Sequence, residues 1–222
     1  TTDKNRIKTM RTKTLLAAAI LSAGLASSMA ADVLSQNVVG YVNKEFVGGA
    51  KYTLVANPLV AATNTVNGLL GSTLPNTSKV LKWGGASFTI YQRTATGWLP
   101  NGNATLNPGE GFFVFVPAGT NTLTCTFVGE VLQGNLTNAY SLLFNLSGNK
   151  FPDSGLVSTM QLTNVPTGDK LYLWKTNTQS YTIHQKTASS WLPSVPSLTP
   201  GDGFFINTPS GTFNWVRNVT VQ

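Results

Sequence analysis

Two carboxylates occupy nearly identical surroundings and are the first candidates for chemistry. Glu110 lies in LNPGEGFFVFV, and Asp202 lies in LTPGDGFFINT. Two carboxylates can act as general acid and base on a glycosidic bond, provided that both flank that bond. The Pro-Gly pair instead favours a tight turn, in which the adjacent carboxylate accepts backbone N–H groups. We therefore expect Glu110 and Asp202 to tie two equivalent turns together, and we predict a non-enzymatic protein.

Other reactive side chains are few. His184 is the only histidine, and Tyr91 occupies the matching place in an internal repeat described below. Cys125, the only cysteine, lies on the apolar side of an alternating segment and is interpreted as a buried apolar residue. An ungapped match places it opposite Arg217. The Cys and His spacing of a zinc site is absent, so we expect no catalytic residue, no metal site and no cofactor.

The two turns recur because much of the sequence is repeated. Residues 79–100 match residues 170–193, with Trp83 opposite Trp174 and a two-residue insertion after Trp174. Both copies consist of short β-branched or aromatic segments bounded by Gly, Pro and Asn, a pattern typical of strands. The sequence predicts an all-β fold of two tandem sandwich-like or barrel-like lobes that arose by internal duplication.

The boundary between the copies contains a segment that resembles both ends of a unit. FVGEV at residues 127–131 closes the first copy, yet it also matches VVGYV at residues 38–42, which opens that copy. The sequence therefore predicts one strand shared between the units. The expected domains are upstream residues with a signal peptide (1–30), a first β repeat (31–131) and a second β repeat (127–222) that share residues 127–131.

The first thirty residues have the pattern of a leader. Arg11 and Lys13 precede an apolar run at residues 15–26, and Ser28-Met29-Ala30 provides small residues for cleavage. This is the pattern of a secretory signal peptide, and the apolar run is too short for a membrane-spanning helix. We expect a secreted protein, extracellular or on the cell surface, without membrane insertion.

The net charge of +7 is concentrated in this leader. The first thirty residues carry a net +4, which leaves +3 for the remainder, and the remaining Lys and Arg form no run. The charge pattern therefore argues against nucleic acid as a partner.

The repeated pattern resembles a family of uncharacterised secreted bacterial proteins. Members carry tandem β repeats with the motifs Y-x-L-x-x-N-P-L and L-x-P-G-E-G-F-F-V, together with a K-x-x-x-W hairpin and a G-W-x-P loop. In the second copy, Tyr140 corresponds to Tyr52. The segment 144–146 lacks the proline of the first motif, and Ser190 replaces the glycine of the G-W-x-P loop. The resemblance implies the fold and export but no activity. The matching positions are Tyr52, Leu54, Asn57, Pro58, Leu59, Lys79, Trp83, Trp98, Pro100 and Pro108 to Val114.

Two functions fit these observations. In the first, the protein is an extracellular structural protein that binds copies of itself head to tail, in filaments or a surface layer, because the opening and closing strands resemble each other and edge strands invite pairing. In the second, the protein is a secreted polysaccharide-binding module, in which Trp98 and Trp191 stack on sugar rings. The alternative for both tryptophans is packing in the core. The assembly residues would be Val38, Val39, Tyr41, Val42, Val216, Val219 and Val221.

Overall fold

The computed structural model describes residues 38–71 and 73–221, in which nearly every regular element is a β-strand. The all-β prediction is confirmed. The predicted signal peptide lies outside the described residues. Within them, no helix is long and apolar enough to span a membrane.

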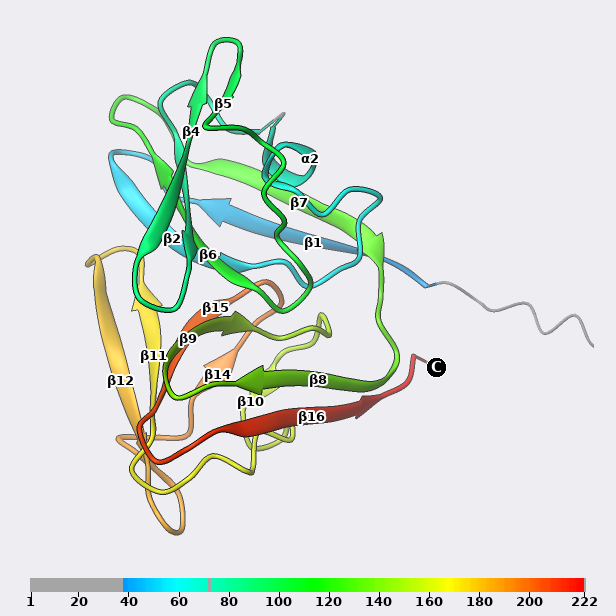
Figure 1. Cartoon of the computed structure of the whole chain (residues 1–222), viewed down its shortest axis with the longest axis vertical. Helices are drawn as coiled ribbons and strands as arrows, with labels where there is room; N and C mark the ends of the chain where they lie inside the picture. The colour runs from blue at the N-terminus through cyan, green and yellow to red at the C-terminus, as the bar shows by residue number, and fades with distance from the viewer. Residues whose placement is uncertain (1–37, 72, 222) are drawn as a thin grey trace, which may run out of the picture. The chain divides into compact units, whose positions relative to one another are not determined.

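The first lobe combines a five-stranded antiparallel sheet with a two-stranded ribbon (Figure 1). Thr65 caps the short helix α2 (Val66–Leu70) by accepting the Gly68 N–H. The sheet has the order β2-β6-β3-β4-β5, and the ribbon pairs β1 with β7. The strands are β1 (Val39–Phe46), β2 (Lys51–Ala56), β3 (Lys79–Trp83), β4 (Phe88–Thr94), β5 (Gly97–Leu99), β6 (Gly111–Val116) and β7 (Leu123–Glu130).

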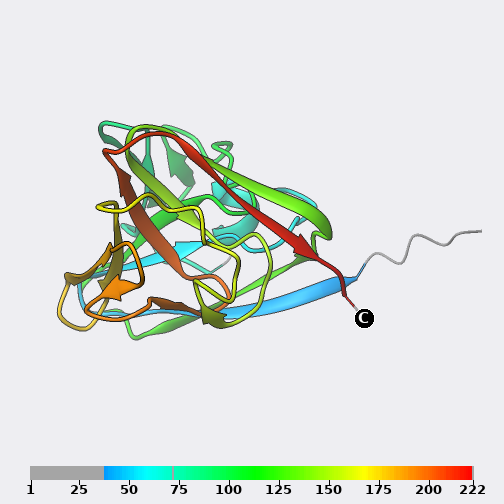
Figure 2. The same cartoon turned by 90° about the horizontal axis from the view of Figure 1, so that it is seen from below.

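The second lobe has the same strand order in its own sheet and ribbon. The five-stranded sheet runs β9-β15-β11-β12-β13, the ribbon pairs β8 with β16, and β10 pairs with β14. The strands are β8 (Gly134–Tyr140), β9 (Leu143–Gly148), β10 (Gly155–Leu156), β11 (Lys170–Lys175), β12 (Ser180–Lys186), β13 (Trp191–Leu192), β14 (Ser197–Leu198), β15 (Gly203–Thr208) and β16 (Phe213–Val219). In both views the start of β1 and the end of β16 lie at the same end of the described body (Figures 1 and 2).

Each ribbon covers one face of its sheet and encloses a separate core. In β7 the side chains alternate, so Cys125 and Phe127 point inward while Thr124 and Thr126 face out. They pack with Val42 and Phe46 of β1 against Phe112 of β6. The second lobe is built alike, with Tyr140 of β8 and Trp215 of β16 packed against Phe204 of β15.

The predicted shared strand is replaced by two separate strands. β7 pairs with β1 along its whole length, and β8 supplies the opening strand of the second lobe by pairing with β16. The reason is that a strand with one apolar face can contribute side chains to only one core. Phe127 lies on that face of β7 and packs in the core of the first lobe. The opening and closing strands therefore meet inside each lobe, and the closing strand β16 is already paired along one edge.

Two residue correspondences taken from the sequence also change. β2 and β9 occupy equivalent places beside β6 and β15. Their registers show that Tyr52 corresponds to Phe144, which lies four residues after Tyr140. The structural counterpart of Cys125 is Trp215, because both are the first inward residue of β7 and β16. Cys125 is 1% exposed, so its interpretation as a buried residue is confirmed.

The two sheets pack against each other through the faces that do not cover the lobe cores. Leu54 and Phe113 of the first lobe meet Leu146 and Phe205 of the second in a third apolar cluster. The consecutive phenylalanines thus divide as strand geometry requires, one into the lobe core and the next into the contact between lobes. All the described residues belong to one compact unit.

Candidate functional site

The two Pro-Gly-acid turns are held by their own carboxylates. A Glu110 oxygen accepts the Asn107 N–H at 3.1 Å, and an Asp202 oxygen accepts the Thr199 N–H at 2.7 Å. The second oxygen of each acid binds a lysine: Lys82 Nζ lies 2.8 Å from Glu110, and Lys44 Nζ lies 2.5 Å from Asp202. The prediction that these acids close turns is confirmed.

Each turn also binds the opposite lobe. Gly148 N–H donates to the Gly109 carbonyl at 3.0 Å, and Ala56 N–H donates to the Gly201 carbonyl at 2.9 Å. The glycine that follows each acid is required by this close approach. A Cβ on Gly203, for example, would lie 2.6 Å from the Val55 carbonyl oxygen.

These contacts define two seams between the lobes. In the first seam, the turn at residues 107–110 rests on β8 and β9. In the second seam, the turn at residues 199–202 rests on β1 and β2. Glu110 lines the cavity of the first seam, whereas Asp202 pairs with Lys44 in the second seam. The two acids therefore stand in different seams, in agreement with their separate structural roles.

The second seam is covered where the repeat carries its two extra residues. The longer turn between β11 and β12 places Gln179 against the free edge of β2, where its amide accepts the Tyr52 N–H at 2.9 Å and donates to the Tyr52 carbonyl at 3.0 Å. The shorter turn between β3 and β4 contains Gly84 and Gly85, which bring no side chain to the corresponding edge. The first seam therefore lacks a counterpart to Gln179.

A second difference lies in the opening strands. Lys44 of β1 crosses the second seam to Asp202. Its structural counterpart in β8 is the shorter Asn138, which bonds within its own lobe to Ser147 Oγ at 2.9 Å.

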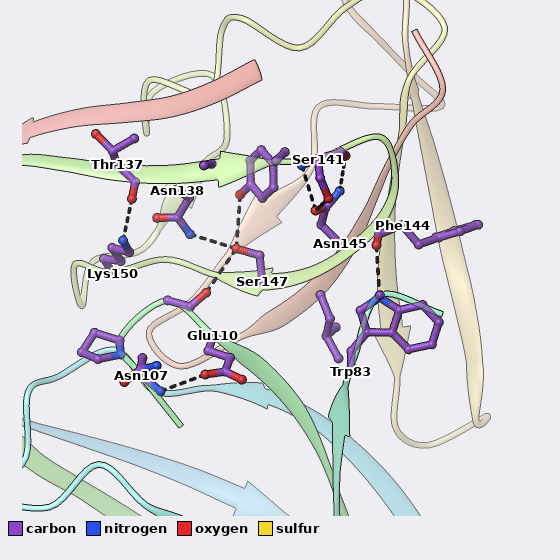
Figure 3. A pocket seen from close by; sticks show the side chains of 16 residues that line it. Trp83, Asn107, Glu110, Thr137, Asn138, Ser141, Phe144, Asn145, Ser147 and Lys150 are labelled. Atoms are coloured by element: carbon purple, nitrogen blue, oxygen red, sulfur yellow. Dashed lines mark hydrogen bonds between the residues drawn. The ribbon is translucent and has the colours of Figure 1, made fainter. Parts of the chain in front are cut away.

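The first seam contains two adjoining cavities, of which Figure 3 shows the polar one. The polar cavity, of about 370 Å³, runs from Glu110 past Ser147 to Lys150. The apolar cavity, of about 340 Å³, is walled by aromatic rings. Trp83 and Phe144 line both, so the two cavities lie side by side, and together they are called the groove. The aromatic residues are Trp83, Phe88, Phe144, Tyr172, Tyr181 and Phe205.

The aromatic rings hold one another in edge-on contacts. Trp83 meets Phe205 with ring centroids 5.4 Å apart and an interplanar angle of 89°, and Phe144 meets Phe205 at 6.1 Å and 89°. Trp83 also donates its indole N–H to the Phe144 carbonyl at 3.1 Å. Phe144 and Tyr181 remain 40% and 38% exposed. The groove is thus a rigid aromatic surface that is open to solvent.

Hydrogen bonds fix the polar end of the groove. Ser147 Oγ donates to the Gly109 carbonyl at 3.2 Å, and Lys150 Nζ donates to the Thr137 carbonyl at 2.5 Å (Figure 3). Desolvation lowers the pKa of Lys150. Burial raises the pKa of Tyr140 above its usual range and that of Tyr181 to about 12. At neutral pH both tyrosines carry their hydroxyl protons.

The tryptophans predicted to stack on sugars lie elsewhere. Trp98 and Trp191 are 6% and 4% exposed and belong to the lobe cores, because β5 and β13 fold them inward beneath loops with cis Leu-Pro bonds. That assignment of the ligand residues is wrong. The signal that was available in the sequence is the other repeated tryptophan, Trp83, together with the shorter turn that follows it.

The predicted assembly residues are divided between surface and core. Val39, Tyr41 and Val216 are exposed, whereas Val42 and Val219 are buried. Val38 is half-buried, and Val221 lies beyond the end of β16 and is exposed. Only part of this set is accessible to a second molecule.

The remaining reactive side chains, His184 and Cys125, are buried. His184 is buried opposite Leu171, with its Nδ1 2.7 Å from the Ser194 carbonyl oxygen. Burial raises the pKa of the Cys125 thiol. Among the described residues, no cluster of three or more His, Cys, Asp or Glu side chains is arranged to hold a metal ion. Comparison with family models, curated proteins and solved structures gives no match for this chain.

Proposed function

We propose that this protein is a non-catalytic, secreted binding module that holds a neutral polysaccharide chain in the groove of the first seam. This is the second of the two functions that the sequence predicts, assigned to other residues. The observation that carries it is that an aromatic cavity and a polar one adjoin at Trp83 and Phe144. A sugar ring needs both, since its C–H faces pack on aromatic rings and its hydroxyl rim needs hydrogen-bonding groups.

The electrostatics of the groove favour an uncharged ligand. Glu110 is neutralised by Lys82 at 2.8 Å, and the remaining polar wall consists mainly of amides and hydroxyls. Lys150 is held by the Thr137 carbonyl. No strong field of either sign is directed into the groove, whereas a phosphorylated or highly acidic ligand would need several unpaired cations.

The pre-formed rings support binding without large rearrangement. Their mutual edge-on contacts restrict their rotation before a ligand arrives, which lowers the entropy lost on binding. A ligand that covers Phe144 and Tyr181 also buries apolar surface that is now exposed. Such a groove matches the general pattern of binding sites, mostly apolar with a few convergent polar groups.

The test uses the secreted protein and a panel of insoluble and soluble neutral polysaccharides, in pull-down assays followed by titration calorimetry with oligosaccharides. Phe144→Ala and Tyr181→Ala are expected to weaken binding by about tenfold each, equivalent to about 1.4 kcal/mol. Leu99→Ala serves as the matched control, because Leu99 is exposed but lies outside the groove. Binding that Phe144→Ala leaves unchanged, or no binding to any member of the panel, would contradict the proposal.

A further inference from the structure

The outer edge of β1 is a free strand edge. Glu130 of β7 lies opposite Val39 but bonds to Val60 and not to β1. Its N–H donates to the Val60 carbonyl at 2.9 Å, and its carbonyl accepts the Val60 N–H at 3.0 Å. In an antiparallel pair such residues alternate with those that bond across the ladder. Val39, Tyr41 and Asn43 therefore direct their own backbone groups away from β7, to the outer edge of the ribbon.

Each of the other three ribbon strands has a partner at one residue of this outer edge. Val60 bonds to β7, as described above. On β8, Lys150 Nζ binds the Thr137 carbonyl at 2.5 Å, and on β16 the Gln161 side chain accepts the Asn218 N–H at 3.0 Å. In the part of the chain that the structure describes, no hydrogen bond reaches the outward backbone groups of Val39, Tyr41 and Asn43. The edge of β1 thus differs from the other three in having no outer contact at all among the described residues.

The same strand exposes apolar side chains where its counterpart is polar. Val39 is 55% and Tyr41 72% exposed, and Val128, opposite Tyr41, is 42% exposed. Tyr41 corresponds to Asn135 on β8. A groove of about 350 Å³ runs beside residues 40–44 of β1, with Pro152 and Pro200 on its far side.

We infer that β1 pairs antiparallel with β1 of a second copy of this chain, across a two-fold axis near Gly40. A free edge is satisfied by another free edge, and among the described ribbon strands β1 is the one on which none of the outward backbone groups has a partner. This arrangement joins two ribbons into a four-stranded sheet in the order β7-β1-β1-β7. It also sets Val39 opposite the partner's Tyr41 twice, an aromatic and β-branched pair of the kind that stabilises neighbouring strands.

The inferred contact differs from the head-to-tail contact expected from the sequence. That contact needs a free closing edge on β16, which Gln161 covers at Asn218. An isologous β1 contact uses the same patch on both copies and closes as a dimer, so it does not propagate into a filament. It is independent of the groove in the first seam.

The oligomeric state of the secreted protein tests the inference. Sedimentation equilibrium is expected to show a reversible dimer of the wild-type chain. Tyr41→Lys should weaken the dimer by about tenfold or more, because it places two ammonium groups beside the axis. Asn135→Lys is the matched control on β8 and should leave the dimer unchanged.

A second variant tests the backbone hydrogen bonds of the strand edge separately from its side-chain contacts. Tyr41→Pro removes an N–H that points outward and takes no part in the β1–β7 ladder, so the fold should persist while the dimer is lost. Thermal unfolding monitored by circular dichroism checks the fold of each variant. A wild-type chain that stays monomeric at high concentration overturns the inference, as does a folded Tyr41→Lys or Tyr41→Pro variant that dimerises like the wild type.

Discussion

Trp83 and Trp174 reach across the contact between the lobes in opposite directions. Trp83 donates its indole N–H to the Phe144 carbonyl of the second lobe, at 3.1 Å, and Trp174 donates to the Tyr52 carbonyl of the first lobe, at 2.8 Å. Tyr52 and Phe144 occupy equivalent places in β2 and β9. The two seams are therefore built on one plan and differ in what covers them.

This reciprocity allows stability and binding to be separated. Trp83→Phe and Trp174→Phe each remove one hydrogen bond between lobes, and each should lower the free energy of unfolding by about 1 kcal/mol. Only Trp83 lines the groove, so only Trp83→Phe should also weaken polysaccharide binding. Urea denaturation and calorimetry on both variants measure the two effects. Equal losses of binding would place the ligand outside the first seam.

A tight contact between the lobes at Gly148 predicts a strongly destabilising substitution. A Cβ on Gly148 would lie 2.1 Å from the Ala56 Cβ and 2.9 Å from the Asp202 carbonyl oxygen. Gly148→Ala should therefore cost about 1–3 kcal/mol of unfolding free energy through overpacking. Adding Ala56→Gly removes the nearer contact and should restore part of that loss. A double-mutant cycle without coupling between these positions would contradict this account.

The turn acids should matter for stability and not for catalysis. Glu110→Gln and Asp202→Asn keep the shape of each side chain but weaken its bonds to the turn N–H and to the lysine. Each should cost about 1–2 kcal/mol, the scale of a hydrogen bond to a charged group. Chemical denaturation measures the cost. A hydrolytic activity that disappears in either variant while stability is unchanged would show that the acid has a catalytic role.

Alkaline pH should destabilise the fold through Tyr181. Burial raises the pKa of its hydroxyl from about 10 to about 12. Because the folded-state pKa lies above the unfolded one, this contribution to stability is complete below pH 10 and is lost as the pH rises through 12. Tyr181→Phe should reduce the fall in stability over this range, as measured by denaturation at a series of pH values. An unchanged pH profile would argue against burial of this hydroxyl in the folded state.

The local features were predictable from sequence because each depends on a few adjacent residues. Pro-Gly and the acid that follows specify a turn wherever they occur, and Glu110 and Asp202 behave as that chemistry requires. Side-chain alternation with a period of two places Cys125 inside and divides Phe112 from Phe113. The all-β class follows from the same short patterns.

Strand partnership and residue correspondence depended on the tertiary structure. Aligning Tyr52 with Tyr140 differs from the structural register by four residues, and an even shift keeps every side chain on the same face, so the period of two does not reveal it. The choice between a shared strand and two separate strands likewise depends on which core receives Phe127.

The candidate site also became visible only in three dimensions. Trp98 and Trp83 are both repeated tryptophans in strands, yet one is enclosed by its own lobe and the other lies at a seam between lobes. The sequence by itself determined the turns, the alternation and the all-β class, because these are local. Which aromatic rings face solvent was decided by the packing of two sheets whose residues are far apart in the chain, and by the two extra residues that cover one seam and leave the other open.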